Sequence, residues 1–160
     1  MIICGTGHRP GKIHKSDYYS HVNTEKLAEF AQECLEEIKP DKVISGGALG
    51  WDQALIRACI SLNIPFIAAV PFKGQESKWP PSSQSVYREM LKWAEDVVIV
   101  CEGEYSVEKM QTRNIWMCDH SDKVLALWDG SSGGTRNCIE YAKECDKEII
   151  NVWGKWIDYK

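Results

Sequence analysis

The sequence predicts an α/β fold in which a doubly wound, mostly parallel sheet of about six strands is covered by helices, as in Rossmann-like proteins. Six short runs rich in branched apolar residues recur along the 160 residues, as expected for strands buried on both faces. Segments with the apolar spacing of helices separate these runs, and this alternation produces parallel strands joined by right-handed crossovers. Glycine-rich stretches follow several runs, which suits connections from strand to helix.

The expected strands are short and spread along the whole chain. They are, in order, "MIIC", "KVIS", "PFIAAV", "DVVIV", "KVLALW" and "EIINVW". The helix between the first two has apolar residues at helical spacing from Leu27 to Ile38. Asn23 or Thr24 is expected to cap the start of this helix, and Pro40 is expected to end it.

Four more helices are expected in the later connections. Apolar residues recur at helical spacing over 54–62 and over 86–94. Ser106 is expected to begin a helix that runs to about His120, and a last helix is expected to begin near Thr135. Strands and helices therefore alternate from one end of the chain to the other.

The composition and length favour one globular domain, residues 1–160, in the cytosol. No apolar run approaches the ~20 residues that a membrane-spanning helix needs, and the first residues lack the pattern of a secretory signal. The seven cysteines form no CxxC pair and mostly fall in apolar segments, so we expect core thiols. Cys118 and His120 are too few ligands for zinc, so neither a metal nor a cofactor is expected.

The net charge argues against nucleic acid as a partner. The formal charge is -4, whereas a nonspecific nucleic-acid binder normally presents a basic surface that displaces counterions. A local basic pocket stays compatible with this composition. Seven tryptophans are many for this length, and Trp51 and Trp79 lie outside the most obvious core strands. They are candidates for stacking on a base, although packing is the commoner use of tryptophan.

Glycine-rich stretches at strand ends are the main indication of function. In an open α/β sheet the ligand lies beyond the carboxyl ends of the strands. The stretches "GTGHRP", "SGGALGWD", "PFKGQESKW" and "DGSSGGTRN" all follow predicted strands. Gly46, Gly47 and Gly50 allow close backbone approach at one helix start, and Gly133 and Gly134 do so at another. Two helix N-termini facing one edge would bind phosphate, although each stretch alone is equally compatible with a short connection.

Charged residues near these glycines are candidates for the same site. His8 and Arg9 follow the first strand and could reach the same phosphate, although a His-Arg pair in a loop is as often solvated surface. Asp52 opens the second helix, where it either favours the helix dipole or holds a ribose hydroxyl. The long loops 5–22 and 71–84 follow strands, where ligands are usually met.

Taken in order, these stretches resemble the SLOG superfamily, a Rossmann-like group that joins the LOG proteins, the DprA core and nucleotide-sensing SLOG domains. "SGGALGWD" is similar to the "SGGARGID" type of loop in DprA, with Leu49 and Trp51 in place of Arg and Ile. The order "GHRP", "SGGALGWDQA", "PFKGQESKW", "RNIWMCDHSDKVLALWDG" and "GGTRNCIEYA" more closely resembles the YpsA/YoqJ-like branch of Firmicutes and their phages. This resemblance covers nearly the whole chain.

The resemblance to LOG proteins implies only part of their active site. Those proteins hydrolyse the N-glycosidic bond of nucleoside 5'-monophosphates, which requires a carboxylate and cations. Arg113 matches the Arg of the family's MxxRKxxM helix, with Asn114 in place of Lys, but the catalytic carboxylate falls on Cys138. Glu140 lies about 200° further around the helix axis. Turnover is therefore not expected. The remaining catalytic candidates are Asp52, Arg113, Asp129 and Glu140.

Together, the residues and the resemblance favour a binding protein for a nucleotide or a nucleotide-derived signal. In the phage setting that the resemblance suggests, such a protein could sequester a host immune signal. LOG-like hydrolysis of nucleoside 5'-monophosphates and DprA-like binding of single-stranded DNA stay open as alternatives, and the LOG resemblance implies a homo-oligomer. The expected ligand contacts are Gly7, His8, Arg9, Ser45, Gly46, Gly47, Gly50, Trp51, Asp52, Pro71, Phe72, Gln75, Trp79, Arg113, Asn114, Asp129, Gly133, Gly134 and Thr135.

Overall fold

The computed structural model describes residues 1–159 and contains a six-stranded sheet in which all neighbouring strands are parallel. Its strand order is β4-β3-β2-β1-β5-β6. The strands are β1 Ile2–Gly7, β2 Lys42–Ser45, β3 Phe66–Val70, β4 Asp96–Ile99, β5 Lys123–Leu127 and β6 Glu148–Asn151. This architecture confirms the fold class predicted from the sequence.

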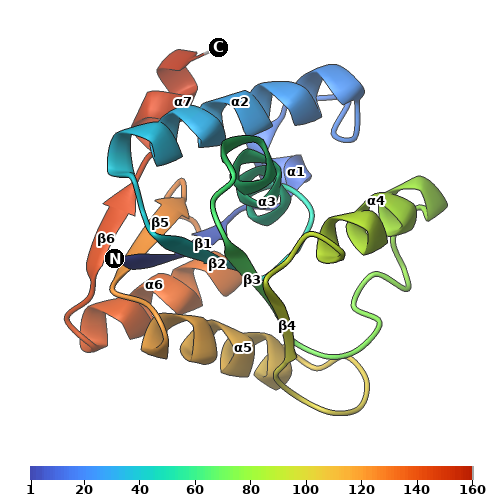
Figure 1. Cartoon of the computed structure of the whole chain (residues 1–160), viewed down its shortest axis with the longest axis vertical. Coiled ribbons are helices and arrows are strands. Elements are labelled where there is room, and N and C mark those ends of the chain that lie inside the picture. Colours follow the sequence, from blue (N-terminus) through green and yellow to red (C-terminus); the bar gives the residue numbers. More distant parts are fainter. Residues whose placement is uncertain (160) are drawn as a thin grey trace.

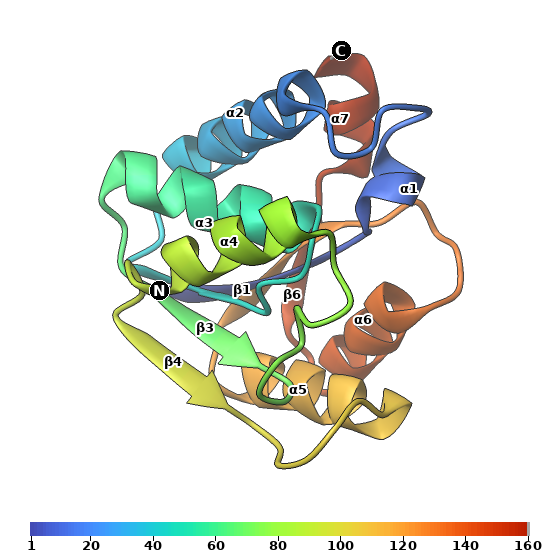
Figure 2. The same ribbon diagram turned by 90° about the vertical axis from the view of Figure 1, so that its right-hand side faces the viewer.

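Helices cover both faces of the sheet, as Figure 1 shows, with α2, α3 and α7 on one side and α5 and α6 on the other. Figure 2 shows α4 beside α3 in the first of these layers. None of the helices within residues 1–159 is long and apolar enough to span a bilayer. The helices are α1 Pro10–Ile13, α2 His21–Ile38, α3 Trp51–Leu62, α4 Pro81–Leu91, α5 Val107–Asp119, α6 Gly134–Glu144 and α7 Trp153–Tyr159.

The core consists of two apolar layers, one on each face of the sheet. The larger layer packs α2, α3 and α7 against the sheet and contains fully buried Leu55, Trp51 and Trp156. The smaller layer lies under α5 and α6 and includes Met117 and Cys138. Burial on both faces explains why the central strands read as nearly continuous apolar runs.

The order in which strands are added to the sheet changes side between β1 and β5, which are parallel neighbours. From β1 the chain proceeds to β2, β3 and β4 on one side, and then returns through α5 to β5 on the other side. The connections that leave β1 and β5 therefore diverge to opposite faces of the sheet. A crevice at the carboxyl ends of two such strands is where open α/β folds bind ligands.

Several element boundaries differ from the sequence prediction. The cap of α2 is Ser20, whose Oγ accepts a hydrogen bond from the Asn23 backbone N at 3.2 Å. Asn23 instead uses its side-chain amide to donate to the Ser16 and Asp17 carbonyls. The last strand ends at Asn151, because the chain turns there into α7, a short helix that the sequence did not indicate. The start of α5 was predicted correctly, since Ser106 caps it.

Candidate functional site

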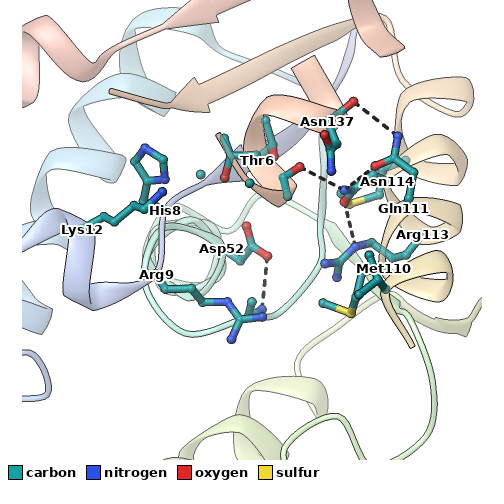
Figure 3. A pocket seen from close by; sticks show the side chains of 18 of the residues that line it. Thr6, His8, Arg9, Lys12, Asp52, Met110, Gln111, Arg113, Asn114 and Asn137 are labelled. Atoms are coloured by element: carbon teal, nitrogen blue, oxygen red, sulfur yellow. Dashed lines mark hydrogen bonds between the residues drawn. The ribbon is translucent and has the colours of Figure 1, made fainter. Parts of the chain in front are cut away.

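A pocket of about 570 Å³ opens at the carboxyl edge of the sheet, beside the neighbouring strands β1 and β5. Figure 3 shows its polar side chains converging from the loop after β1, the start of α3 and the length of α5. Its charged lining residues are three cations and one carboxylate: Arg9, Lys12, Arg113 and Asp52. Nine of the residues expected from the sequence line it: Gly7, His8, Arg9, Asp52, Arg113, Asn114, Gly133, Gly134 and Thr135.

The start of α6 forms one wall of this pocket and carries unused hydrogen-bond donors. Gly133 precedes the helix with φ 137°, a conformation that favours glycine, and no side chain within residues 1–159 caps the helix. In the part of the chain that the structure describes, the backbone N–H groups of Gly134, Thr135 and Arg136 have no acceptor. Such a helix start binds anions through its free N–H groups and its positive dipole end.

Lys12 lies next to the start of α6, although it belongs to the short helix α1. Its Nζ donates to the Ser131 hydroxyl at 2.8 Å and to the Ser132 carbonyl at 3.1 Å. The ammonium group is therefore held beside the loop that leads into α6. A positive charge next to free backbone N–H groups strengthens the attraction for an anion at this wall.

The start of α3 differs from the prediction, because it does not offer a second seat for an anion. The Trp51 backbone N donates to the His8 carbonyl at 3.3 Å, and the Gln53 N donates to the Ala48 carbonyl at 3.2 Å. The Asp52 carboxylate also lies at this helix start and accepts a hydrogen bond from the Ala48 N at 3.2 Å. Protein carbonyls use these donors, and a carboxylate repels an incoming phosphate. Of the two predicted seats, the start of α6 is therefore the one that suits an anion.

Arg113 extends from α5 to the floor of the pocket and is only 5% exposed. Its Nη1 donates to the Gly46 carbonyl at 3.0 Å and to the Ala69 carbonyl at 3.3 Å, while Nε donates to Asn114 Oδ1 at 3.1 Å. Burial lowers the pKa of the guanidinium, and the nearby charge of Asp52 opposes this change. Backbone carbonyls thus position a buried cation at the ends of β2 and β3.

Asp52 shares this floor and is 6% exposed. Burial raises the pKa of its carboxyl, whereas the charge of Arg113 and the hydrogen bond from Ala48 oppose the rise. Of the four catalytic candidates, Asp52 and Arg113 line the pocket, but Asp129 and Glu140 do not. Glu140 lies on the solvent side of α6, where it pairs with Arg136 at 2.9 Å.

Several predicted contacts support the pocket without lining it, and others lie elsewhere. Ser45 is fully buried, and its hydroxyl donates to the Asp52 carbonyl at 2.9 Å. Gln75 donates to the Gly46 carbonyl at 3.0 Å, so the loop after β3 braces the glycine loop from outside. Gly46, Gly47 and Gly50 shape that loop. The remaining predicted contacts outside the lining are Pro71, Phe72, Trp51, Trp79 and Asp129.

The two tryptophans proposed for base stacking occupy other places. Trp51 is 0% exposed and donates from Nε1 to the Leu125 carbonyl at 3.3 Å, so its predicted stacking role was wrong and it belongs to the core. Trp79 packs edge-on against Tyr87 with ring centroids 5.1 Å apart, away from the pocket. Trp51 follows a glycine-rich loop because the helix start must pack closely on β1, where Gly7 leaves room for the indole.

Sequence reasoning missed several lining residues, and the largest group of them lies on α5 and in the loop before it. Met110 and Met117 occupy the two Met positions of the MxxRKxxM pattern, which did not by itself identify them as ligand contacts. Tyr105 and Val107 are 64% and 63% exposed at the pocket. The signal available in the sequence was an aromatic residue just before the cap of a helix. The missed lining residues include Thr6, Lys12, Tyr105, Val107, Met110, Gln111, Met117, Ser132 and Asn137.

His8 joins the loops that leave β1 and β5. Its Nε2 lies 2.7 Å from Asp129 Oδ1 and 3.0 Å from the Asp129 backbone N. Burial lowers the pKa of His8, while the hydrogen bond and charge of Asp129 act in the opposite direction and Lys12 lowers it slightly further. Hydrogen bonds from Ser131 are the main cause that lowers the pKa of Asp129 to about 2. Desolvation acts in the opposite direction, and the hydrogen bond and charge of His8 lower the pKa further.

This arrangement predicts a loss of stability in mild acid. The folded state favours neutral His8, so its contribution is present above an unfolded pKa of about 6.5 and disappears as the pH falls through the lower folded value. The His8→Gln variant should therefore lose less thermal stability than the wild type between pH 7 and pH 5, as measured by circular dichroism melts. His21→Gln, at an exposed histidine, is the matched control and should keep the wild-type loss. An unchanged loss in His8→Gln would contradict the prediction.

Comparison with known proteins bears on the family and the fold of the chain. The chain matches the YspA SLOG family over residues 3–152. It is 37% identical over 137 residues to the SPβ prophage-derived protein YoqJ of Bacillus subtilis (strain 168), covering 75% of this chain and 80% of that protein. It is also 25% identical over 169 residues to a UPF0398 protein of Bacillus thuringiensis (strain Al Hakam), covering 98% of this chain and 89% of the relative.

Solved structures of low sequence identity share the fold. DNA processing protein A (DprA) from Streptococcus pneumoniae has a TM-score of 0.62 at 17% identity, covering 92% of this chain and 48% of that protein. DprA from Helicobacter pylori has a TM-score of 0.62 at 19% identity, covering 93% of this chain and 63% of that protein. The chain thus spans about half to two thirds of the DprA chains that it matches.

One expectation about partners is overturned by this comparison. Helicobacter pylori DprA, which has the same fold, binds single-stranded DNA. The exclusion of nucleic acid on the ground of net charge was therefore wrong. A total of -4 averages over the whole surface, whereas the pocket gathers three cations against one carboxylate. Local charge, which depends on the fold, decides what a pocket attracts. Because the family match covers nearly the whole chain and the YoqJ relative exceeds a third identity, the protein belongs to the YspA SLOG family.

Proposed function

We propose that the pocket binds a nucleotide or a nucleotide-derived signalling molecule, with a phosphate group at the start of α6. One observation carries this proposal: the backbone N–H groups of Gly134 and Thr135, which have no acceptor among residues 1–159, lie at one wall of the pocket, and the Lys12 ammonium is held at the loop that leads to them. A helix N-terminus together with a lysine is a common way to hold a phosphate oxygen.

The size and lining of the pocket support a nucleotide rather than free phosphate. A volume of about 570 Å³ lies within the usual range for sites that enclose a small organic ligand. Tyr105, Val107 and Met110 add an aromatic and apolar section at the entrance. An aromatic base has a flat apolar surface that packs on such side chains.

The relationship to a prophage-derived protein supports a binding role in phage-infected cells. A protein that binds a nucleotide signal without turnover would lower its free concentration, provided that the protein is abundant enough. The carboxylate position of LOG proteins is occupied by Cys138, which is fully buried with its Sγ 3.7 Å from Cys118 Sγ. Binding without hydrolysis is therefore the form of the proposal that these residues favour.

Single-stranded nucleic acid is the second candidate, and the fold shared with DprA favours it. A backbone phosphate presents the same oxygens to α6 and Lys12 as a nucleotide phosphate does. Electrostatic attraction to several phosphates would make such binding strongly dependent on salt. A free nucleotide contacts fewer cations, so its affinity should respond less steeply to salt concentration.

The test measures binding of a nucleotide panel and of a short oligodeoxythymidylate by isothermal titration calorimetry. Lys12→Ala should weaken binding of the phosphorylated ligand about tenfold, because one charge-assisted hydrogen bond is lost. Lys15→Ala, an exposed lysine outside the lining, is the matched control and should bind as the wild type does. Free nucleotides binding more tightly than the oligonucleotide would support the leading candidate. If no phosphorylated ligand binds, the proposed function is wrong.

A further inference from the structure

Two oppositely charged side chains at the floor of the pocket each retain one polar atom without a partner. Asp52 uses Oδ2 to accept from Ala48, and Oδ1 has no hydrogen-bond partner among residues 1–159. Arg113 uses Nε and Nη1, and its Nη2 has no partner within the same described range. Both side chains are more than nine-tenths buried. Both unused atoms reach the open space of the pocket instead of being sealed in protein, so a ligand there can complete their hydrogen bonds.

The two groups are near each other but do not form an ion pair. A Cβ built on Gly46 would lie 2.6 Å from the Arg113 Cζ and 2.9 Å from Asp52 Oδ2. Since both atoms are this close to one point, Cζ and Oδ2 lie no more than 5.5 Å apart. Their nitrogen and oxygen atoms are nevertheless separated by more than the 4.0 Å of an ion pair. Figure 3 shows the Arg113 guanidinium directed toward Asp52 across the pocket.

Only some chemical groups satisfy both side chains at once. A hydroxyl donates one hydrogen bond and accepts others, so it can donate to a carboxylate and accept from a guanidinium. A phosphate oxygen only accepts and would be repelled by Asp52, and an ammonium only donates and would be repelled by Arg113. Hydroxyl groups therefore suit the unused atoms of both side chains, and each charge-assisted hydrogen bond would be about 2.7–2.9 Å long.

The position of this pair relative to α6 identifies the part of a nucleotide that would reach it. The Asn114 side chain accepts from Arg113 Nε and donates to the Gly134 carbonyl at 3.4 Å, so one residue separates the pair from the proposed phosphate site. In a nucleotide the ribose is joined directly to the phosphate. Tyr105 and Val107 are exposed at the entrance, which leaves that end of the pocket to the base.

We infer that Asp52 and Arg113 bind the vicinal hydroxyl groups of a ribose, and that the pocket selects ribose phosphates over 2'-deoxyribose phosphates. This inference rests on the proposed function and specifies the ligand of the same site. A ribose diol presents two hydroxyls, one for each charged group, while a deoxyribose retains only one. The ribose phosphate belongs either to a free ribonucleotide or to the terminus of an RNA strand.

The experiment compares each ribonucleoside 5'-monophosphate with its 2'-deoxy counterpart on the wild-type protein by isothermal titration calorimetry. The ribonucleotide should bind at least about tenfold more tightly, because the deoxy ligand leaves a buried charge without a hydrogen bond. A short RNA and a DNA of the same sequence form the second pair of ligands, and a preference for RNA would support the same ribose contact. Equal affinity of ribose and deoxyribose ligands would overturn the inference and leave the proposed function intact, whereas absence of binding by all four ligand types would refute the proposed function.

A variant tests whether the charged pair causes the preference for ribose over deoxyribose. Asp52→Asn should reduce the ribose preference, because the carboxylate charge that accepts from one hydroxyl is lost, and it should still bind the deoxynucleotide through its phosphate. Glu76→Gln is the matched control, because Glu76 is a mostly buried acid that pairs with Arg88 outside the lining. It should keep the wild-type preference. A ribose preference as large in Asp52→Asn as in the wild type would show that other residues bind the hydroxyls and would overturn the assignment.

Discussion

Replacing Gly46 by alanine is expected to reduce nucleotide affinity by about two orders of magnitude. The added Cβ would overlap the Arg113 guanidinium, lie 2.6 Å from its Cζ and approach Asp52 Oδ2 to 2.9 Å. Gly46 does not have a positive φ, so alanine is allowed by the backbone and the effect is purely steric. Displacing both charged groups removes two charge-assisted hydrogen bonds to a ligand, each worth about 1.5–3 kcal/mol.

The same substitution should also destabilise the fold, because Arg113 cannot move away without losing its carbonyl acceptors. A buried guanidinium that loses its partners costs about 3–5 kcal/mol. Urea unfolding would measure this loss, and calorimetry at a temperature where the variant is folded would measure affinity. Gly154→Ala is the matched control, because no atom of the described residues lies within 4 Å of a Cβ at that position in α7, outside the pocket. Wild-type affinity in a folded Gly46→Ala protein would show that Asp52 and Arg113 take no part in binding.

The parallel sheet could be predicted because it depends on local patterns. Runs such as "KVLALW" are buried on both faces, and the alternation with helices dictates parallel pairing and the crossover hand. The start of α6 was also predictable within a residue, since glycines at 133 and 134 precede a clear helical pattern. These features bring nine predicted residues together at one edge of the sheet.

The remaining features could not be predicted because they depend on contacts between distant segments. Nothing near Trp51 in sequence indicates that its backbone N would donate to the His8 carbonyl and so close the start of α3. Lys12 reaches the pocket only because β1 and β5 are neighbours, which brings its loop beside Ser131. A total charge likewise says nothing about where cations gather. Composition and periodicity therefore identify the edge that carries the site, but not which donors are already used there.

Replacing Trp51 by alanine should lower the free energy of unfolding by about 3–5 kcal/mol, the usual cost of truncating a large core aromatic side chain. The indole is 0% exposed and lies 6.0 Å, between centroids, from the Phe30 ring. A Cβ added at Gly7 would come within 2.5 Å of it, so β1 is packed directly on this side chain. Trp51→Phe should cost less, because it retains much of the side-chain volume. Its remaining cost includes the lost hydrogen bond to the Leu125 carbonyl.

The contrast between stability and affinity distinguishes a core residue from a base-stacking residue at this position. A stacking tryptophan would contribute to affinity and little to folding, whereas a core tryptophan does the reverse. Trp93→Ala, at a residue 65% exposed, should change the free energy of unfolding by less than about 0.5 kcal/mol and serves as the matched control. If urea unfolding showed Trp51→Ala to be as stable as Trp93→Ala while ligand affinity fell, the indole would contact the ligand, and packing of α3 on β1 would need another source of stability.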